Sequence, residues 1–514
     1  MYEVEQMKKV CFALILSVVL ILCGCAEDKD KKQNTGETNV INLQMGMPES
    51  LNPLNAQKQS VRDAMLLCYE PLFESNEQME ICGVLGEDCK ISDDSFSAII
   101  KLKDSVLWHD GRKFTSNDVI YTIDYLKNNP DSPYAFCVKY IESATAIDSV
   151  MLKLKLSRPY AQIVHSLYFP IIPAHNDNIE KKMVGTGPYA YKNYIEASAL
   201  EFTRNEFWHG GEAKTKEIKC TVVRDNIASA TAFNTGIIDA VTKNYFDLSN
   251  NVIKSNMRSV RYPSSEFEFM AFNHNSALFK SSAIRLAISL ALNRAEIVMD
   301  AYGSNAAAAN IPVHPDSQVA SALTSSEYNL NNALEMLFLE GYSKNEKTGL
   351  LQNSKGEKLK FTIKVNEENS QRIKCAELIK NQLLKAGIEV NIASLPFEDY
   401  HNAIENGQFE AYIGGVKSAN IYDFEFLLSK NGALNTFGYD SKYMELSLSA
   451  IANAPSKDSL ENALMNFDEV YTREQPICTI AYLSDVLITN DKVMGKLMPR
   501  LNSPYANIKN WSAK

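Results

Sequence analysis

The amino-terminal stretch constrains this chain more than any other feature. Lys8 and Lys9 precede an apolar run over residues 10–22, in which Ser17 is the one polar residue, and Gly24 follows before Cys25. A basic end, an apolar core of this length and a small residue before a cysteine are typical of a secretory signal. The run is too short for a comfortable transmembrane span. We therefore expect residues 1–24 to be a signal peptide and the rest of the chain to fold outside the cytoplasm.

Residues 22–25, which read Leu-Cys-Gly-Cys, resemble a bacterial lipobox, in which the cysteine is acylated and becomes the new amino terminus. We expect Cys25 to carry lipid and to anchor the protein to the cell membrane. The alternative is an uncleaved anchor helix. The stretch after Cys25 is polar and charged, so it cannot bury enough surface to offset chain entropy. Residues 25–38 are therefore predicted to be the lipidated cysteine and a flexible tether.

Length and charge limit what the remaining chain can be. About 490 residues are too many for a single hydrophobic core, which predicts two or three domains. A formal net charge of −10 argues against nucleic acid or an anionic lipid surface as the main partner. Seven cysteines lie beyond Cys25, and their spacing does not match that of a metal site. We therefore expect these cysteines to be buried and to pack as small hydrophobic residues. Cys82 and Cys89 are close enough in sequence for a local disulfide.

Apolar patterns predict a mixture of strands and helices. Alternation predicts strands at residues 40–43, 96–102, 149–156, 388–392 and 481–489. Helical spacing predicts helices at residues 62–72, 116–127, 279–302, 330–339 and 371–386, the last ended by Gly387. Strand–helix alternation in the second half and mixed elements in the first half predict two α/β or α+β lobes.

Several stretches, in order and at the expected separations, resemble the extracytoplasmic solute-binding proteins of ABC importers, in the oligopeptide, dipeptide and nickel cluster known as family 5. Residues 100–119 follow the family pattern L-R-x-G-V-x-F-H-D-G-x-P-F-T-A-x-D-V, and residues 185–189 are its G-T-G-P-Y. The other matching stretches are residues 50–54, 68–72, 204–208, 272–273, 284–287 and 291–294. The resemblance covers nearly all of the mature chain.

This resemblance implies a large, two-lobed α/β fold of the type II periplasmic-binding-protein kind, with three subdomains and a ligand cleft between lobes that close on the ligand. Its implied divisions are lobe I at residues 39–272 with an inserted subdomain at about 60–180, lobe II at 273–477, and a return to lobe I at 478–514. No catalytic residue, cofactor or metal site is expected.

A short segment of lobe II is expected to line the cleft. In oligopeptide-binding members a segment G-W-x-A-D-Y does so, and its Asp binds the α-ammonium of the peptide. Here Asn420 stands at the Asp position and Lys417 at the Trp position, which removes a charge-assisted hydrogen bond and adds repulsion. Either Asp423 replaces the anchor or the ligand presents no free amine, and Lys417 either faces the cleft or points to water. The candidate residues here are Lys417, Ser418, Ala419, Asn420 and Asp423.

Lobe I is expected to supply two further ligand contacts. Tyr134 lies in a stretch that resembles the family's S-P-Y-A segment, whose Tyr contacts peptide backbone. Met47 and Glu49 lie where such receptors pair an extended peptide through β-type hydrogen bonds, which recognise main chain and ignore side-chain identity.

Other motif residues are expected to have structural roles. Gly185 and Gly187 mark a tight backbone passage where Cβ atoms would not fit. Arg285 and Arg294 are expected to form ion pairs that fix lobe structure, and Trp108 to be a core aromatic.

The expected function is that of a lipid-anchored, monomeric substrate-binding subunit of an ABC importer, which captures peptides and delivers them to the permease. Its partners would be a peptide ligand, the permease and ATPase subunits, and the membrane through Cys25, with no nucleic acid. The alternatives are a receptor for nickel, a metal chelate or another small solute, and a peptide-binding signalling lipoprotein without a transport role. An enzyme is not expected, because no nucleophile with a partnered base and no Gly-rich phosphate loop appears.

Overall fold

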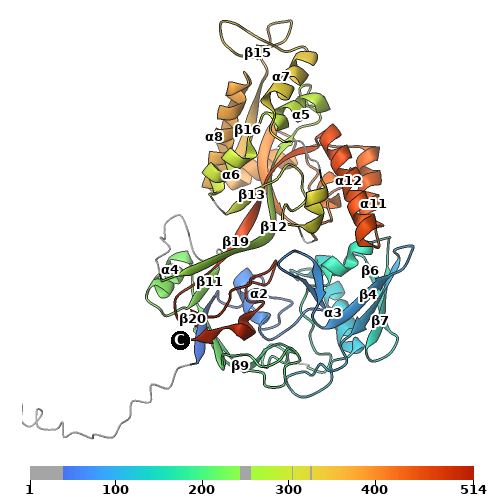
Figure 1. Ribbon diagram of the computed structural model, residues 1–514, viewed down its shortest axis with the longest axis vertical. Coiled ribbons are helices and arrows are strands. Elements are labelled where there is room, and N and C mark those ends of the chain that lie inside the picture. Colours follow the sequence, from blue (N-terminus) through green and yellow to red (C-terminus); the bar gives the residue numbers. More distant parts are fainter. Residues whose placement is uncertain (1–38, 177, 243–255, 304, 324–326, 419) are drawn as a thin grey trace, which may run out of the picture. The chain divides into compact units, whose positions relative to one another are not determined.

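The central element of the fold in the computed structural model is a mixed sheet of eleven strands (Figure 1). The structure describes residues 39–514 except 177, 243–255, 304, 324–326 and 419, and residues 39–514 form one compact unit. The predicted signal, the tether, Cys25 and Ala419 lie outside the described residues. Along the sheet the strand order is β17 (Glu389–Leu395), β16 (Lys360–Asn366), β18 (Ala411–Lys417), β12 (Arg258–Phe272), β19 (Ile477–Thr489), β11 (Ala240–Thr242), β1 (Val40–Met45), β10 (Glu217–Val222), β9 (Ala199–Arg204) and β8 (Tyr189–Ile195), with β13 (Ala306–Ala308) beside β19.

Smaller sheets complete the strand structure. A four-stranded antiparallel sheet within the predicted insertion has the order β4 (Gly86–Ile91), β5 (Ser97–Leu102), β7 (Met151–Leu156) and β6 (Ile141–Ala146). The two-stranded pairs are β2 (Phe73–Ser75) with β3 (Ile81–Gly83), β14 (Ser343–Lys344) with β15 (Leu351–Gln352), and β20 (Val493–Met494) with β21 (Ser512–Ala513).

Helices cover these sheets and frame the space between the lobes. They are α2 (Gln59–Met65), α3 (Ser116–Asn128), α4 (Asn226–Asn234), α5 (Ser282–Leu290), α6 (Arg294–Tyr302), α7 (Leu330–Leu339), α8 (Ser370–Lys385), α9 (Phe397–Glu405), α10 (Glu425–Leu428), α11 (Lys442–Ala452) and α12 (Lys457–Glu474). Short 3-10 turns are η1 (Ala135–Val138), η2 (Ala161–Ser166), η4 (Gln318–Ala322) and η5 (Ile508–Asn510). In the part of the chain that the structure describes, no helix has the length and apolar character needed to cross a membrane.

Separate hydrophobic cores define the two lobes. The largest core draws on residues 41–262 and on the carboxy-terminal return at 487–511. Two others lie almost wholly within residues 267–483 and pack on the opposite half of the sheet. Strands β12 and β19 pair along almost their whole length and contribute side chains to the cores of both lobes. The molecule is therefore a two-lobed α/β protein whose lobes share a sheet.

Local sequence signals placed several elements correctly. The strand predicted at residues 40–43 is β1, which runs parallel to β10. Thr115 caps α3 through a capping box with Asp118, which satisfies backbone N–H groups that a helix start leaves free. Helix α8 is followed by Gly387, whose φ of +85° is the left-handed conformation that favours glycine.

Two helix predictions were wrong in their bounds. The helix predicted at residues 62–72 is α2, which starts earlier and ends at Met65. The chain then leaves the helix because the carbonyls of Leu67 and Cys68 accept hydrogen bonds from Tyr189 and Gly187 at 3.0 and 2.8 Å. The single helix predicted at 279–302 is instead two helices, α5 and α6, because the side chain of Asn293 caps a new helix start by accepting from the N–H of Glu296.

The backbone passage predicted at Gly185 and Gly187 is confirmed. A Cβ atom on Gly185 would lie 1.8 Å from the carbonyl oxygen of Cys68, and one on Gly187 would lie 2.7 Å from that of Leu67. No side chain fits at those separations, so both positions require glycine for steric reasons. Trp108 is buried at 2% exposure, as expected of a core aromatic.

Arg285 and Arg294, which lie in stretches that match the family pattern, have structural roles, but not through the ion pairs that were expected. Arg285 donates to the carbonyl oxygens of Phe279, Lys280, Glu474 and Gln475. Arg294 donates to the carbonyl oxygen of Thr479 at 2.7 Å and to the carbonyl and hydroxyl oxygens of Ser289 on α5. Arg285 therefore ties α5 to the carboxy-terminal end of α12, and Arg294 ties α6 to β19, each by satisfying backbone carbonyls. The seven cysteines are all free, so Cys82 and Cys89 form no disulfide.

Candidate ligand-binding cavity

A cavity of about 400 Å³ lies between the two lobes. One wall comes from α2 and η1 of lobe I, and the opposite wall from the end of β18 and the turn that follows it in lobe II. The lining residues are Gln59, Arg62, Leu66, Pro133, Tyr134, Phe136, Lys139, Tyr168, Val416, Lys417, Ser418, Asn420, Asp423, Phe426, Leu434 and Asn502. The volume and the mixture of apolar walls with a few polar groups are those of a small-molecule site.

Five of the predicted ligand residues line this cavity together. They are Tyr134, Lys417, Ser418, Asn420 and Asp423. Lys417 is the last residue of β18 and its side chain is exposed, whereas Ser418 and Asn420 are 6% and 3% exposed. Lys417 thus lines the cavity, and its contact with a ligand remains a prediction.

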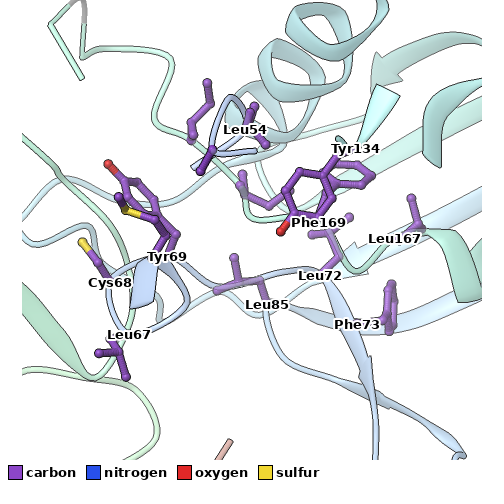
Figure 2. Packing of buried hydrophobic residues seen from close by; sticks show 14 of the residues in the cluster. Leu54, Leu67, Cys68, Tyr69, Leu72, Phe73, Leu85, Tyr134, Leu167 and Phe169 are labelled. Atoms are coloured by element: carbon purple, nitrogen blue, oxygen red, sulfur yellow. The ribbon is translucent and has the colours of Figure 1, made fainter. Parts of the chain in front are cut away.

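Tyr134 forms part of the apolar wall. Its ring packs edge-on against that of Tyr168, with ring centroids 6.3 Å apart, and it belongs to the buried cluster shown in Figure 2. Burial raises the pKa of its hydroxyl above the ordinary range, so the hydroxyl stays protonated at neutral pH. A hydroxyl held on a rigid aromatic pair can donate to a ligand carbonyl or accept from a ligand N–H.

Asn420 is committed to the protein itself. Its amide nitrogen donates to the Tyr160 hydroxyl at 2.7 Å and to the carbonyl oxygen of Gln162 at 3.2 Å. Its amide oxygen accepts from the N–H of Tyr422 at 3.0 Å. Both donors are used, and they cross from lobe II to lobe I. Asn420 therefore acts here as an inter-lobe hydrogen-bonding residue.

Asp423 is also paired across the lobes. Its carboxylate lies 2.9 Å from Nζ of Lys139, and the Asp423 side chain is only 9% exposed. Nearby, the guanidinium of Arg158 makes two hydrogen bonds to the carboxylate of Glu425. Both cations stand over the ring of Tyr140, at 4.4 and 4.9 Å from its centroid. Two ion pairs and one aromatic ring thus join the lobes at this edge of the cavity.

The predicted contacts Met47 and Glu49 do not line this cavity. They lie just after β1, where Nζ of Lys58 contacts both the Glu49 carboxylate at 2.7 Å and the carbonyl oxygen of Met47 at 2.9 Å. The Met47 side chain is 40% exposed. The role predicted for this segment, backbone pairing with an extended ligand, remains a prediction.

Sequence reasoning missed the α2 wall. Arg62 and Gln59 line the cavity, and Asp63 is 4% exposed on the same helix. Its carboxyl accepts from Nε2 of Gln59 at 2.7 Å, and burial raises its pKa to about 7, against the lowering influence of the nearby charges of Lys417 and Arg62. The available signal was a pair of adjacent charged residues within an apolar-periodic helix, which is unusual for a buried helix.

A second cavity of about 410 Å³ adjoins the first. Leu66, Tyr168 and Asn502 line both of them. Its far wall carries Glu70, whose carboxylate accepts from Nε1 of Trp208 and contacts Nε2 of His209, each at 2.9 Å.

The fold and the inter-lobe cavity define the class of protein. Two lobes on a shared sheet, with a cavity lined from both, are the arrangement of periplasmic-type binding proteins, which bind a ligand between lobes. Residues 80–436 match the model of the bacterial extracellular solute-binding proteins, family 5 Middle. The chain belongs to this family, and it is a binding protein and not an enzyme.

Individual relatives agree with the family. The oligopeptide-binding protein AppA of Bacillus subtilis is 25% identical over 405 residues, which cover 73% of this chain and 74% of AppA. The peptide transport periplasmic protein SapA of Haemophilus influenzae is 24% identical over 502 residues, covering 85% of this chain and 86% of SapA. Among solved structures, NikZ from Campylobacter jejuni in complex with Ni(L-His) has a similar fold, with a TM-score of 0.67 at 22% identity over 93% of this chain and 99% of NikZ.

Proposed function

We propose that this protein is the substrate-binding subunit of an ABC importer, which captures peptides outside the membrane and delivers them to a permease. The observation that carries the proposal is the cavity lined by segments from both lobes, since movement of the lobes would open and close it around a ligand. The closed form would dock on the permease, and separate ATPase subunits would drive import. This chain would contribute recognition alone.

Several observations support a peptide as the ligand. The relatives AppA and SapA are named for peptide binding or transport. A second cavity of similar size shares three lining residues with the first, which suits an elongated ligand. Tyr134 lines the cavity beside apolar residues such as Pro133 and Phe136, and its hydroxyl can donate to or accept from a peptide main-chain group.

The peptide would present no free amine to the β18 end of the cavity. Asp423 is the only carboxylate among the lining residues, and Lys139 already neutralises it. The amide oxygen of Asn420 already accepts from the N–H of Tyr422, and the amide carries no negative charge to offset a ligand ammonium. N-acetylated peptides should therefore bind about as well as free ones, and a large preference for free amines would refute this part of the proposal.

A metal chelate is the second candidate, favoured by the fold shared with NikZ. Among the described residues no group of three or more His, Cys, Asp or Glu side chains is placed to hold a metal ion. Nickel would therefore have to arrive as a complex with an organic ligand. A signalling lipoprotein that binds peptide without transport would have the same cavity, and genes for permease and ATPase subunits beside this one would favour the importer.

Lipid on Cys25 would hold the protein at the outer face of the cell membrane. Metabolic labelling with a fatty-acid analogue should mark the wild-type protein and not Cys25→Ala, which should be released from the membrane fraction. Labelling of the variant would contradict the anchor.

Native mass spectrometry of the protein, purified without refolding, tests the ligand class directly. A ladder of adducts with peptide masses would support the peptide proposal and give the preferred length. A single non-peptide adduct would contradict it in favour of the chelate.

A further inference from the structure

The inter-lobe cavity has a charge opposite to that of the chain. Its lining contains three cations, Arg62, Lys139 and Lys417, and one carboxylate, Asp423, which leaves an excess of two positive charges. The whole chain has a formal net charge of −10. The charge of the cavity lining therefore differs in sign from the charge of the protein as a whole.

Two of these cations have no carboxylate partner. In the described part of the chain, no carboxylate lies within ion-pair distance of Lys417 or Arg62, whereas Lys139 pairs with Asp423. The guanidinium of Arg62 donates to the carbonyl oxygens of Ala56 and Gln57 and to the side-chain oxygen of Gln59, which are neutral acceptors. Its positive charge therefore remains.

Asp63, an acidic group near both cations, compensates their charges incompletely. Asp63 lies close enough to Lys417 and Arg62 for both to lower its pKa, but burial is the larger influence and raises that pKa to about 7. A carboxyl that is partly protonated at neutral pH supplies less than one full negative charge. The positive field at this end of the cavity is thus left for a ligand to neutralise.

We propose that the bound solute places a carboxylate between Arg62 and Lys417. This inference rests on the proposed function, because it assumes that the cavity holds the transported solute. Charge-assisted hydrogen bonds from a guanidinium and an ammonium are among the strongest that a carboxylate can accept, and they strengthen as water is excluded. An ammonium at the same place would meet two uncompensated like charges.

The adjoining cavity suits the rest of such a solute. Its charged lining residues are three acids (Asp63, Glu70 and Glu74) and three bases (Lys103, Arg500 and Lys509), so it carries no comparable excess. The charge contrast between the two cavities orients the solute, with its anionic end against α2 and β18 and its remainder beyond Leu66 and Tyr168.

The test uses a tryptic digest of casein as the probe, presented in three forms to the purified protein and read by native mass spectrometry. One portion is untreated, one is N-acetylated, and one is methyl-esterified so that its carboxylates are neutral. We expect acetylation to change adduct intensity by less than about threefold and esterification to reduce it at least about tenfold, which corresponds to about 1.4 kcal/mol. Equal binding of the esterified and untreated portions would overturn the inference while leaving the proposed function intact.

Variants then assign the effect to the cavity. Lys417→Gln should reduce binding of the untreated digest about tenfold and leave the weak binding of the esterified digest unchanged. Lys347→Gln, in the exposed turn between β14 and β15, is the matched control and should behave as wild type. An equal loss for both forms of the digest in Lys417→Gln, or no loss, would contradict a carboxylate at this residue. Equal melting temperatures would show that both variants are folded.

Two further arms identify the source of the carboxylate. Peptides recovered from the untreated digest are resynthesised as carboxy-terminal amides: loss of binding assigns the terminal carboxylate, and retained binding assigns an acidic side chain. If no peptide binds, Ni²⁺ is offered with L-histidine and with histamine, which lacks the carboxylate. Binding of the histidine complex alone would support the inference on the chelate branch, and equal binding of the two would overturn it. If no probe binds, the proposed function fails, and the inference fails with it.

Discussion

The side-chain amide of Asn420 donates a 2.7 Å hydrogen bond to the hydroxyl of Tyr160 and so joins lobe II to lobe I beside the ligand cavity. A residue expected from the sequence to face a ligand is instead an internal connection between lobes. It follows that the cavity wall and the lobe contact are formed by nearby residues of one short segment, because Lys417 lines the cavity three positions earlier.

Replacing Asn420 by Asp should destabilise the protein rather than restore an amine anchor. A carboxylate at this position would face the carbonyl oxygen of Gln162, now 3.2 Å from the amide nitrogen, with no proton to share. We expect the free energy of unfolding to fall by about 2 kcal/mol, measured by urea denaturation. Tyr160→Phe, which removes only the hydroxyl, should cost about 1 kcal/mol. Unchanged stability of Asn420→Asp together with a new preference for free-amine peptides would show that the side chain faces the ligand.

The ion pair between Lys139 and Asp423 should contribute measurably to stability because the carboxylate is shielded from water. Its side chain is 9% exposed, although that of Lys139 is 41% exposed, which limits the effect. A double-mutant cycle with Lys139→Ala and Asp423→Ala should give a coupling energy of about 1 kcal/mol. The exposed pair Lys430–Asp440 is the control and should couple by less than about 0.5 kcal/mol. Equal coupling in the two pairs would refute the role of burial.

Asp63 should make stability depend on pH around neutrality. Its pKa is about 7 in the folded protein against an ordinary value of 3.8, because burial disfavours the charged form. The folded state therefore holds a proton that the unfolded state loses between these values, and the stabilisation present below pH 4 is lost as pH rises through 7. Asp63→Asn keeps an oxygen that can accept from Gln59 and removes the titration.

We expect Asp63→Asn to match wild type in unfolding free energy below pH 4 and to be more stable by roughly 3 to 4 kcal/mol at pH 8. Urea denaturation at a series of pH values would measure this difference. Asp300→Asn, at an exposed position on α6, should follow the wild-type pH dependence throughout. A difference between Asp63→Asn and wild type that does not grow with pH would contradict the assigned pKa.

Gly185→Ala should prevent stable folding. The new methyl group would lie 1.8 Å from the carbonyl oxygen of Cys68, and backbone atoms cannot yield that distance without breaking the contact between the two segments. We expect a loss of more than about 3 kcal/mol, seen as a large drop in melting temperature or in recovered folded protein. Gly341→Ala is the control, because Gly341 has a φ of +88° in open space and should cost only about 1 kcal/mol. Similar losses in the two variants would contradict the steric explanation.

Much of the fold was predictable because its signals are local. The glycine after α8 and the alternation in β1 each depend on a few neighbouring residues, and each was located correctly. One error arose where a distant contact decided the outcome. Helix α2 ends just before Leu67 and Cys68, whose carbonyl oxygens accept hydrogen bonds from residues more than a hundred positions away. A local sequence pattern cannot predict such contacts.

The candidate site shows the same division. The resemblance to a family motif brought Lys417, Asn420 and Asp423 to the cavity wall, where the structure places them. The resemblance could not show that Lys139 forms an ion pair with Asp423, because the two residues are 284 positions apart in sequence. Asp63 escaped notice for a related reason: its importance comes from burial between lobes, and burial is a property of the assembled fold.

The two long strands that pass through both lobes also bear on how the protein melts. β12 and β19 pair from Arg258 with Thr489 to Ala271 with Ile477, and the register shifts twice, between Pro263 and Phe267 and between Glu268 and Phe269. If the core of one lobe unfolded, half of the β12–β19 pair would lose its packing while the other half stayed packed in the second lobe. The two lobes should therefore unfold together in one cooperative transition. Calorimetry should show one endotherm whose van 't Hoff enthalpy equals the calorimetric enthalpy.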